Sequence, residues 1–203
     1  SNDIGSSPFW SALSWQFILT MAAMFVARVA VMAYYVFFSI YTDTLGMDDT
    51  LKGLAWSVGV ASEVVLMFFS GAITKRIGIR LLFGLGLLGI IVRSSIYALF
   101  PIVWVVFAAQ CLHSLTFAAL HVSSIRLVAA EAPPGRSGTA QLTFAAIALG
   151  GGGAIGGWLT GLVATTWGYS VMFGLGAGLG ALALLVFIPV LLSPGRSESR
   201  SEA

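Results

Sequence analysis

Charged residues are scarce in this 203-residue chain, and cysteine is almost absent. Asp, Glu, Lys and Arg together make up 9% of the residues, whereas soluble domains carry about 25%. The single cysteine, Cys111, excludes an intrachain disulfide. Residues 1–8 lack the basic stretch of a signal peptide, and the chain does not begin with Met. We therefore expect an integral membrane protein whose sequence begins within a longer chain or after processing.

Apolar runs of about 20 residues recur along the chain. They are long enough to cross a bilayer as helices and too long for the ten-residue strands of a membrane barrel. We predict an all-α membrane protein with six transmembrane helices, at about 14–41, 53–74, 81–100, 102–129, 138–165 and 169–192. Polar turns and turns with proline or glycine separate them. Residues 1–13 are expected to form a linker, and residues 193–203 a cytoplasmic tail.

The basic residues between the predicted helices are distributed unevenly. The loops after the second and fourth helices and the C-terminal tail contain Lys75, Arg76, Arg80, Arg136, Arg196 and Arg200. Arg126 lies at the same end of the fourth helix, whereas Lys52 on the other side is surrounded by aspartates. Because cytoplasmic loops are enriched in Lys and Arg, we predict that both ends of this segment face the cytoplasm.

The fifth and sixth predicted helices are rich in glycine. Spacings such as Gly152-x-x-x-Gly156 and Gly157-x-x-x-Gly161 favour close approach of helix backbones in a membrane. Tight packing is the first interpretation; sliding of a smooth helix during a conformational change is the alternative. A nucleotide-binding loop is excluded because no strand precedes these glycines.

A few ionisable residues lie deep inside the apolar runs: Arg28, Glu63, Arg93, His113 and His121. A charge at the centre of a spanning helix costs roughly 2.5–3.5 kcal/mol on insertion scales, so it tends to face a cavity and to be functional. Arg93 and His113 each lie about twelve residues from a helix end, or roughly 18 Å at 1.5 Å per residue. They approach the middle of a ~30 Å core from opposite sides, and we expect them to share a site.

Gln110, His113, Phe117 and His121 occupy one stripe of the fourth helix, within about 80° of one another at 100° per residue. Histidine titrates near neutral pH, and Glu63 in an apolar pocket can hold a proton, so both residue types suit proton coupling. A buried ion pair between Glu63 and Arg93 is the structural alternative. Arg28 has no acid in its own helix, which indicates a partner elsewhere or an anionic ligand.

The segment that links the second and third helices resembles a signature of the major facilitator superfamily. It reads Gly71-Ala-Ile-Thr-Lys75-Arg76-Ile-Gly78-Ile-Arg80, and the signature reads G-x-x-x-D-R-x-G-R-R. Lys75 takes the place of the acid, and Ile79 that of the first residue of the closing basic pair. The resemblance implies a gating loop formed by Gly71, Lys75, Arg76, Gly78 and Arg80.

Three longer stretches resemble the phenylpropionate and lactose permease branch of this superfamily. They are Tyr34-Tyr35-x-Phe37-x-x-Ile40-Tyr41, Trp56-Ser57-x-Gly59-Val60-x-x-Glu63-Val64 and Gln110-x-Leu112-His113-x-x-Thr116-Phe117-x-x-x-His121. The resemblance covers nearly the whole chain and implies the C-terminal half of the fold, a 3+3 inverted repeat with substrate bound between two halves. The expected partner is an N-terminal six-helix half or a second copy of this chain.

The same resemblance implies roles for individual residues. In the lactose permease, an arginine of the ninth helix and a histidine of the tenth lie in the sugar-binding and proton-coupling site, and Arg93 and His113 match them. The permease's essential carboxylate of the eighth helix would fall at Val60, with Glu63 nearly one turn later. Its proton-carrying carboxylate would fall at Thr116, which implies that proton carriage has moved to Glu63 or to a histidine.

We therefore predict a proton-coupled secondary transporter of the bacterial inner membrane, and not an enzyme. Glu63 and His113 are expected to carry or sense the proton. The expected substrate contacts are Arg28, Arg93, Gln110, His121, Tyr34 and Phe117. An aromatic carboxylate is the predicted solute, and a sugar or nucleoside is the alternative. A structural half without transport is an alternative from another class. An intramembrane hydrolase is disfavoured because only one carboxylate lies at depth. No cofactor, metal or nucleic acid is expected to bind.

Overall fold

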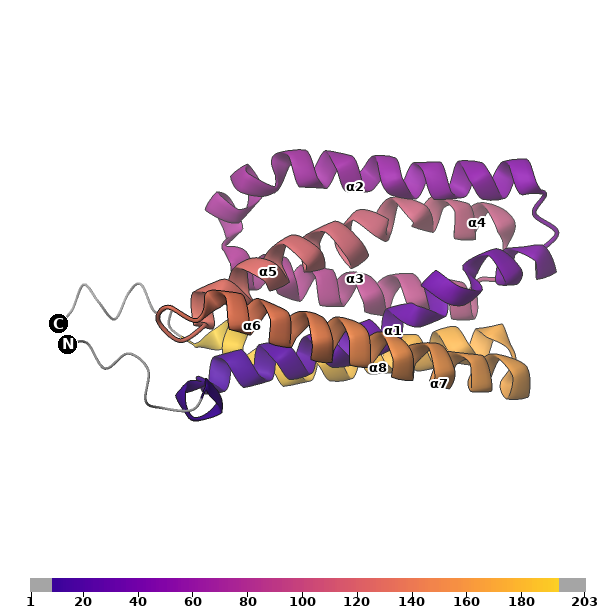
Figure 1. Ribbon diagram of the computed structural model, residues 1–203. Coiled ribbons are helices and arrows are strands. Elements are labelled where there is room, and N and C mark those ends of the chain that lie inside the picture. Colours follow the sequence, from indigo (N-terminus) through magenta and orange to yellow (C-terminus); the bar gives the residue numbers. More distant parts are fainter. Residues whose placement is uncertain (1–8, 194–203) are drawn as a thin grey trace, which may run out of the picture.

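The computed structural model describes residues 9–193, which form helices joined by short turns, with no strand among them (Figure 1). Four membrane crossings are single helices: α1 (Trp15–Thr44), α2 (Asp49–Ile77), α3 (Ile79–Leu99) and α8 (Tyr169–Leu192). The fourth crossing combines α4 (Val103–Ala108), η2 (Ala109–Leu112), η3 (Leu115–Ala119) and α5 (Leu120–Glu131). The fifth combines α6 (Ser137–Phe144), η4 (Ala145–Gly151) and α7 (Gly152–Trp167).

Six helices in this part of the chain are long and apolar enough to cross a membrane, as predicted. A short 3-10 helix, η1 (Phe9–Ala12), precedes the first crossing. Residues 1–8 of the expected linker and residues 194–203 of the expected tail, with Arg196 and Arg200, lie outside the described residues.

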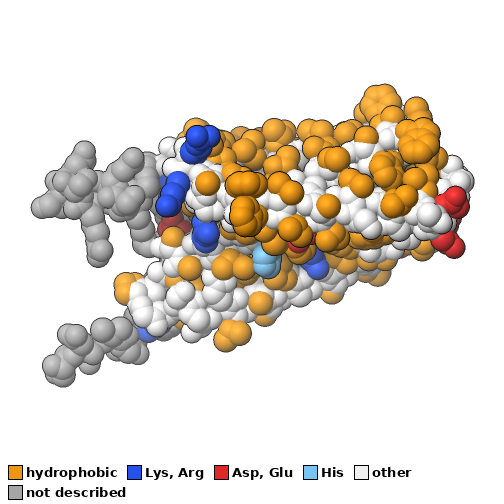
Figure 2. Space-filling model, turned by 90° about the horizontal axis from the view of Figure 1, so that it is seen from above, with side chains coloured by type: hydrophobic (Ala, Val, Ile, Leu, Met, Phe, Trp, Pro, Cys, Tyr) orange, Lys and Arg blue, Asp and Glu red, His pale blue; other side chains and the backbone are white. Residues whose placement is uncertain are grey.

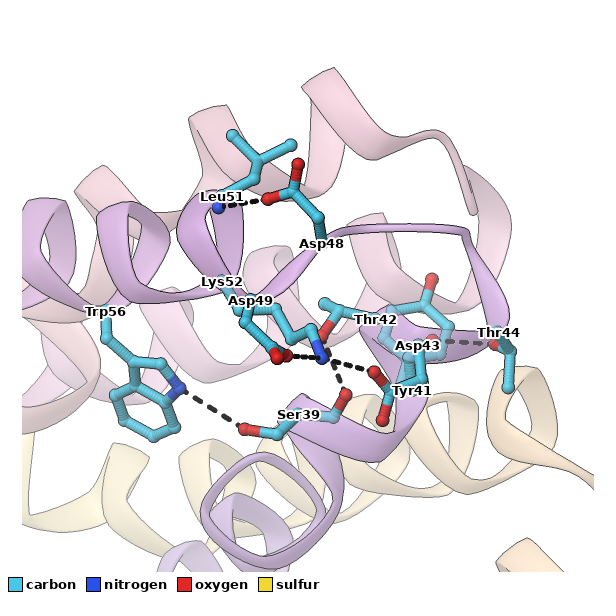
Figure 3. Close-up of polar contacts among 10 residues, drawn as sticks. All are labelled: Ser39, Tyr41, Thr42, Asp43, Thr44, Asp48, Asp49, Leu51, Lys52 and Trp56. Atoms are coloured by element: carbon cyan, nitrogen blue, oxygen red, sulfur yellow. Dashed lines mark hydrogen bonds and ion pairs between the residues drawn. The ribbon is translucent and has the colours of Figure 1, made fainter.

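Polar side chains define where the first two helices begin and how they are joined. Ser14 Oγ accepts a hydrogen bond from the Phe17 amide at 3.1 Å, and Asp48 Oδ1 accepts one from the Leu51 amide at 2.7 Å (Figure 3). These bonds satisfy amides that the first turn of a helix leaves unpaired. Next to the second cap, Lys52 pairs with both Asp43 and Asp49 and connects the two helices at this end (Figure 3).

The basic segment at 75–80 is mostly helical. Lys75 and Arg76 lie exposed in the last turn of α2, and α3 begins at Ile79. Gly78 alone makes the turn, at a φ of 79° that side chains rarely adopt. The expectation of a loop over this whole segment was therefore wrong, because one glycine is sufficient to reverse the chain direction.

Close helix packing depends on glycine, as the spacings predict. A Cβ added at Gly156 would lie 2.8 Å from the Val29 backbone of α1, and one at Gly152 would lie 3.0 Å from Arg28 Cβ. On the other side of the bundle, a Cβ at Gly89 would lie 2.8 Å from Leu115 Cβ. These contacts bring α7 against α1 and η3 against α3, so they set the spacing of the helices that carry the polar residues.

The helix α2 is set apart from the rest. It runs along one edge of the bundle (Figure 1), and only 11% of its most apolar 18-residue stretch is buried. Val60, Val64 and Phe68 are among its exposed apolar side chains. In a membrane this surface faces lipid or another protein, so α2 is the crossing least fixed by contacts within this chain.

The two ends of the molecule differ in charge. Lys and Arg side chains gather towards the end where α1 begins and α8 ends, and acidic side chains gather at the opposite end (Figure 2). At the basic end, Arg80 Nη2 lies 3.2 Å from Glu131 Oε1, and its Nη1 donates to the Ser193 carbonyl at 2.6 Å. Arg80 thus connects the start of α3 to the ends of α5 and α8.

Candidate substrate and proton-coupling site

Arg93 lies at the centre of a buried polar cluster. It is in the middle of α3, and only 4% of its surface is exposed. Its Nε donates to Tyr97 Oη at 2.9 Å and its Nη2 to Gln110 Oε1 at 2.9 Å. Its Nη1 donates to Thr116 Oγ1 at 2.9 Å and meets His113 Nδ1 at 3.0 Å. Four of the five guanidinium N–H groups therefore have partners within the protein.

The partners of Arg93 also bind one another. Gln110 is fully buried; its Oε1 accepts a bond from Tyr34 Oη at 3.1 Å, and its Nε2 donates to Tyr97 Oη at 3.0 Å. The Tyr34 ring lies 3.7 Å from Arg93 Cζ, a cation–π contact. We call Arg93, Gln110, Tyr34, Tyr97, His113 and Thr116 the Arg93 cluster. A cavity of about 10 Å³ remains beside it, which has room for one water at most.

The cluster determines which nitrogen of His113 can carry a proton. Arg93 has only donors, so His113 Nδ1 must accept, and the neutral ring carries its hydrogen on Nε2. That nitrogen lies 3.5 Å from Glu63 Oε2. Glu63 thus pairs with His113 and not with Arg93, and the alternative of an ion pair between Glu63 and Arg93 was wrong. Arg93 has no carboxylate partner among residues 9–193.

Three rings of the fourth crossing are stacked in a ladder. The His113 and Phe117 rings lie 5.8 Å apart at 14°, and the Phe117 and His121 rings lie 5.6 Å apart at 7°. Side chains four residues apart on an α-helix advance by about 40°. The π-helical turn η3, Leu115–Ala119, offsets this drift because it has more residues per turn. The predicted stripe is therefore present, although the backbone of this segment departs from a regular α-helix.

The surroundings of Arg28 differ from those of Arg93. Its Nε is shielded from solvent but has no hydrogen-bond partner among residues 9–193. Its Cζ lies 5.3 Å from the centre of the Tyr35 ring. A cavity of about 40 Å³ separates α1 from Phe117 and His121. Arg28 thus combines an unpaired, shielded Nε with a place in the lining of a cavity.

Sequence reasoning did not single out Tyr97 or Thr116 as members of the site. Tyr97 follows Arg93 by four residues on the same helix, and this spacing places both side chains on one face. Thr116 was considered only as the place of a carboxylate in related permeases; here its hydroxyl accepts a bond from Arg93. Of the expected gating residues, Gly71 and Lys75 are exposed on α2 and Gly78 caps it, whereas Arg80 bonds to Glu131.

Comparison with known proteins agrees with this architecture. The profile of the MFS_1 like family matches residues 5–175. The chain belongs to this family of the major facilitator superfamily. A probable 3-phenylpropionic acid transporter of Escherichia coli is 30% identical over 154 residues, which cover 72% of this chain and 38% of the relative. Major facilitator superfamily domain-containing protein 6-like protein B of Xenopus laevis is 24% identical over 77% of this chain and 25% of its own length.

Solved transporters have the same fold at low identity. The nucleoside transporter NupG superposes with a TM-score of 0.76 at 15% identity, over 88% of this chain and 48% of that one. A peptide transporter, POT, superposes with a TM-score of 0.71 at 20% identity, over 98% and 44% respectively. This chain spans less than half the length of these proteins. Its six helices are one half of a major facilitator fold, which is a fold of multi-pass membrane transporters and not of enzymes.

Proposed function

We propose that this chain is the C-terminal half of a proton-coupled secondary transporter that takes up a small organic anion, such as an aromatic carboxylate. The observation that carries the proposal is the buried chain of contacts from Arg93 through His113 to Glu63. Ionisable side chains at this depth are costly, and those that occur tend to line transport pathways. The relative named as a probable 3-phenylpropionic acid transporter supports the choice of solute.

The contact between His113 and Glu63 provides a means of coupling. With Glu63 ionised, His113 Nε2 lies 3.5 Å from a negative carboxylate, and this contact holds α2 against the fourth crossing. A proton on Glu63 removes that charge and weakens the contact. Because α2 is otherwise fixed by few contacts, protonation of Glu63 would free it to move, and substrate and proton would cross together. Gln110 and Tyr34 keep Arg93 in place during this change.

The proposed setting is the inner membrane of a bacterium, with the basic end of the bundle in the cytoplasm. The enrichment of Lys and Arg at that end supports this orientation (Figure 2). The missing partner is an N-terminal six-helix half or a second copy, and it would complete the cavity wall opposite the first and fourth crossings. Transporters of this architecture bind substrate between two such halves.

Uptake by the full-length protein in proteoliposomes tests the proposal. An inward-directed proton gradient should drive accumulation of radiolabelled 3-phenylpropionate. Glu63→Gln should abolish accumulation against a gradient, whereas exchange of labelled for unlabelled solute should continue because exchange needs no net proton movement. Asp49→Asn, which also replaces a carboxylate by its amide but at an exposed position, is the control and should accumulate normally.

Other results have distinct meanings. Full accumulation by Glu63→Gln would remove Glu63 from the coupling mechanism. Accumulation of lactose or uridine in place of the acid would replace the proposed solute by a sugar or a nucleoside. No accumulation of any of these solutes would favour a structural or assembly role.

A further inference from the structure

Two arginines lie at mid-membrane depth in this half, and their surroundings are opposite. Arg93 uses four of its five N–H groups within the protein. Arg28 has a shielded Nε with no acceptor among residues 9–193, and none of the ion pairs of this part of the chain includes it. A buried donor without an acceptor is costly, and a group that accepts from Arg28 would remove that cost.

The cavity beside Arg28 has a definite size and chemistry. It lies between α1, the fourth crossing and η4, and Arg28, Tyr35, Phe117, His121 and Leu149 are among its walls. Its volume of about 40 Å³ holds about three water-sized groups, which is the size of a carboxylate. Its lining thus includes both a cation and the side chains of Phe117 and His121.

We propose that Arg28 is the subsite for the substrate's carboxylate, and that Arg93 holds His113 in position without touching the substrate. The carboxylate would accept from Nε and one Nη of Arg28, the two-pronged geometry that guanidinium groups favour. The aromatic part of the solute would lie along Phe117 and His121, where an offset stack is available. This inference rests on the proposed function and names the part of the site that selects an acid.

A second pocket borders this subsite. It has a volume of about 520 Å³ and shares His121 and Leu149 with the smaller cavity. It extends along α6 to Gly138 and Gln141, which lie towards the basic end of the bundle. A solute in this pocket would lie against His121, which also lines the cavity beside Arg28. By contrast, the 10 Å³ beside Arg93 leaves no room for a ligand group.

Equilibrium binding to the purified full-length transporter tests the assignment. Two radiolabelled probes of the same shape are compared: 3-phenylpropionate and the neutral 3-phenylpropanamide. In the wild type the acid should bind more tightly. Arg28→Gln should weaken binding of the acid by about tenfold to hundredfold, the value of a lost charge-assisted pair, and should leave binding of the amide nearly unchanged. Arg28→Lys should restore part of the preference for the acid.

Two further variants separate the subsite from general effects of charge or folding. Arg126→Gln removes an exposed arginine of the fourth crossing and should preserve the preference for the acid. Gly153→Asp places a carboxylate near Arg28, because a Cβ at Gly153 would lie 3.6 Å from Arg28 Nε. This internal carboxylate should compete with the acid and abolish its preference, whereas binding of the amide shows that the protein is folded.

An unchanged ratio of acid to amide affinity in Arg28→Gln would overturn the inference. The proposed function would stand as long as a proton gradient still drives uptake of the acid. A wild type that binds both probes equally would also overturn it. Loss of proton-driven uptake in the wild type is the separate result that would reject the proposed function.

Discussion

Arg93 and Arg28 differ in the number of hydrogen-bond acceptors that the protein supplies to each guanidinium group. Two phenol groups, an amide, a hydroxyl and an imidazole surround the Arg93 guanidinium, and all of them can be neutral. Arg28 contacts one aromatic ring and an empty cavity. A guanidinium group whose N–H donors all have partners can orient its neighbours, whereas one with free donors can bind an incoming anion. Burial alone therefore does not reveal what a membrane arginine does.

The largest effect that separates the two arginines should come from Arg93→Ala. This change leaves several buried partners without a donor and releases the orientation of His113, so uptake should fall to below about 1% of wild type. Binding of both the acid and the neutral amide should weaken, in contrast to Arg28→Gln. The measurement is uptake in proteoliposomes, with the amount of protein inserted in the membrane determined in parallel.

Insertion of Arg93→Ala should remain normal, because the change removes a costly charge from α3. Arg126→Ala, at an exposed position of α5, is its control and should transport. Wild-type uptake by Arg93→Ala would exclude this residue from the site.

A smaller effect should distinguish the two tyrosines that accompany the arginines. Tyr97→Phe removes an acceptor shared by Arg93 and Gln110, and two buried donors left unpaired cost about 1–3 kcal/mol each. Tyr35→Phe removes a hydroxyl that has no hydrogen-bond partner among the residues described, so it should cost less than about 0.5 kcal/mol. The apparent melting temperature in detergent should fall clearly for the first variant and little for the second. Equal losses would show that the Arg93 cluster is not the more tightly connected region.

The smallest effect concerns the helix contact behind Arg28. Gly156→Ala introduces a methyl group 2.8 Å from the Val29 backbone, and overpacking of this kind costs about 1–3 kcal/mol. Gly153→Ala places its methyl group 3.6 Å from the end of the Arg28 side chain, an ordinary contact with a flexible group. Thermal unfolding of the two variants should show a loss of stability for Gly156→Ala and little change for Gly153→Ala. A loss in Gly153→Ala as large as in Gly156→Ala would mean that the region around Arg28 is as closely packed as the rest of the α1–α7 contact.

Much of the candidate site follows from position along the helices. Depth counting predicts that Arg93 and His113 share a level in the membrane, and their 3.0 Å contact agrees with it. The periodicity of the fourth crossing predicts a common face for Gln110, His113, Phe117 and His121, although Gln110 turns towards Arg93 while the three rings form the ladder. The roles of these residues in binding and coupling remain proposals.

Other features of the site do not follow from position. The sequence allowed an ion pair between Glu63 and Arg93, whereas the structure brings Glu63 to His113. The π-helical turns at Leu115–Ala119 and Ala145–Gly151 leave no clear mark in the sequence, since they arise where packing against neighbouring helices outweighs the regular hydrogen-bond pattern. The cavity beside Arg28 likewise cannot be predicted from the sequence pattern, because it depends on how the helices pack.

Hydropathy by itself determined the six helices, because a chain in a bilayer must satisfy its backbone hydrogen bonds within each crossing and has no other structure available to it over about 20 apolar residues. The tertiary structure decided which polar groups meet. Those contacts depend on helix rotation and on separations of a few ångströms, and glycines such as Gly89 and Gly156 set these separations. For that reason two arginines at similar depth differ: the guanidinium of Arg93 is hydrogen-bonded within the protein, whereas that of Arg28 lies beside a cavity.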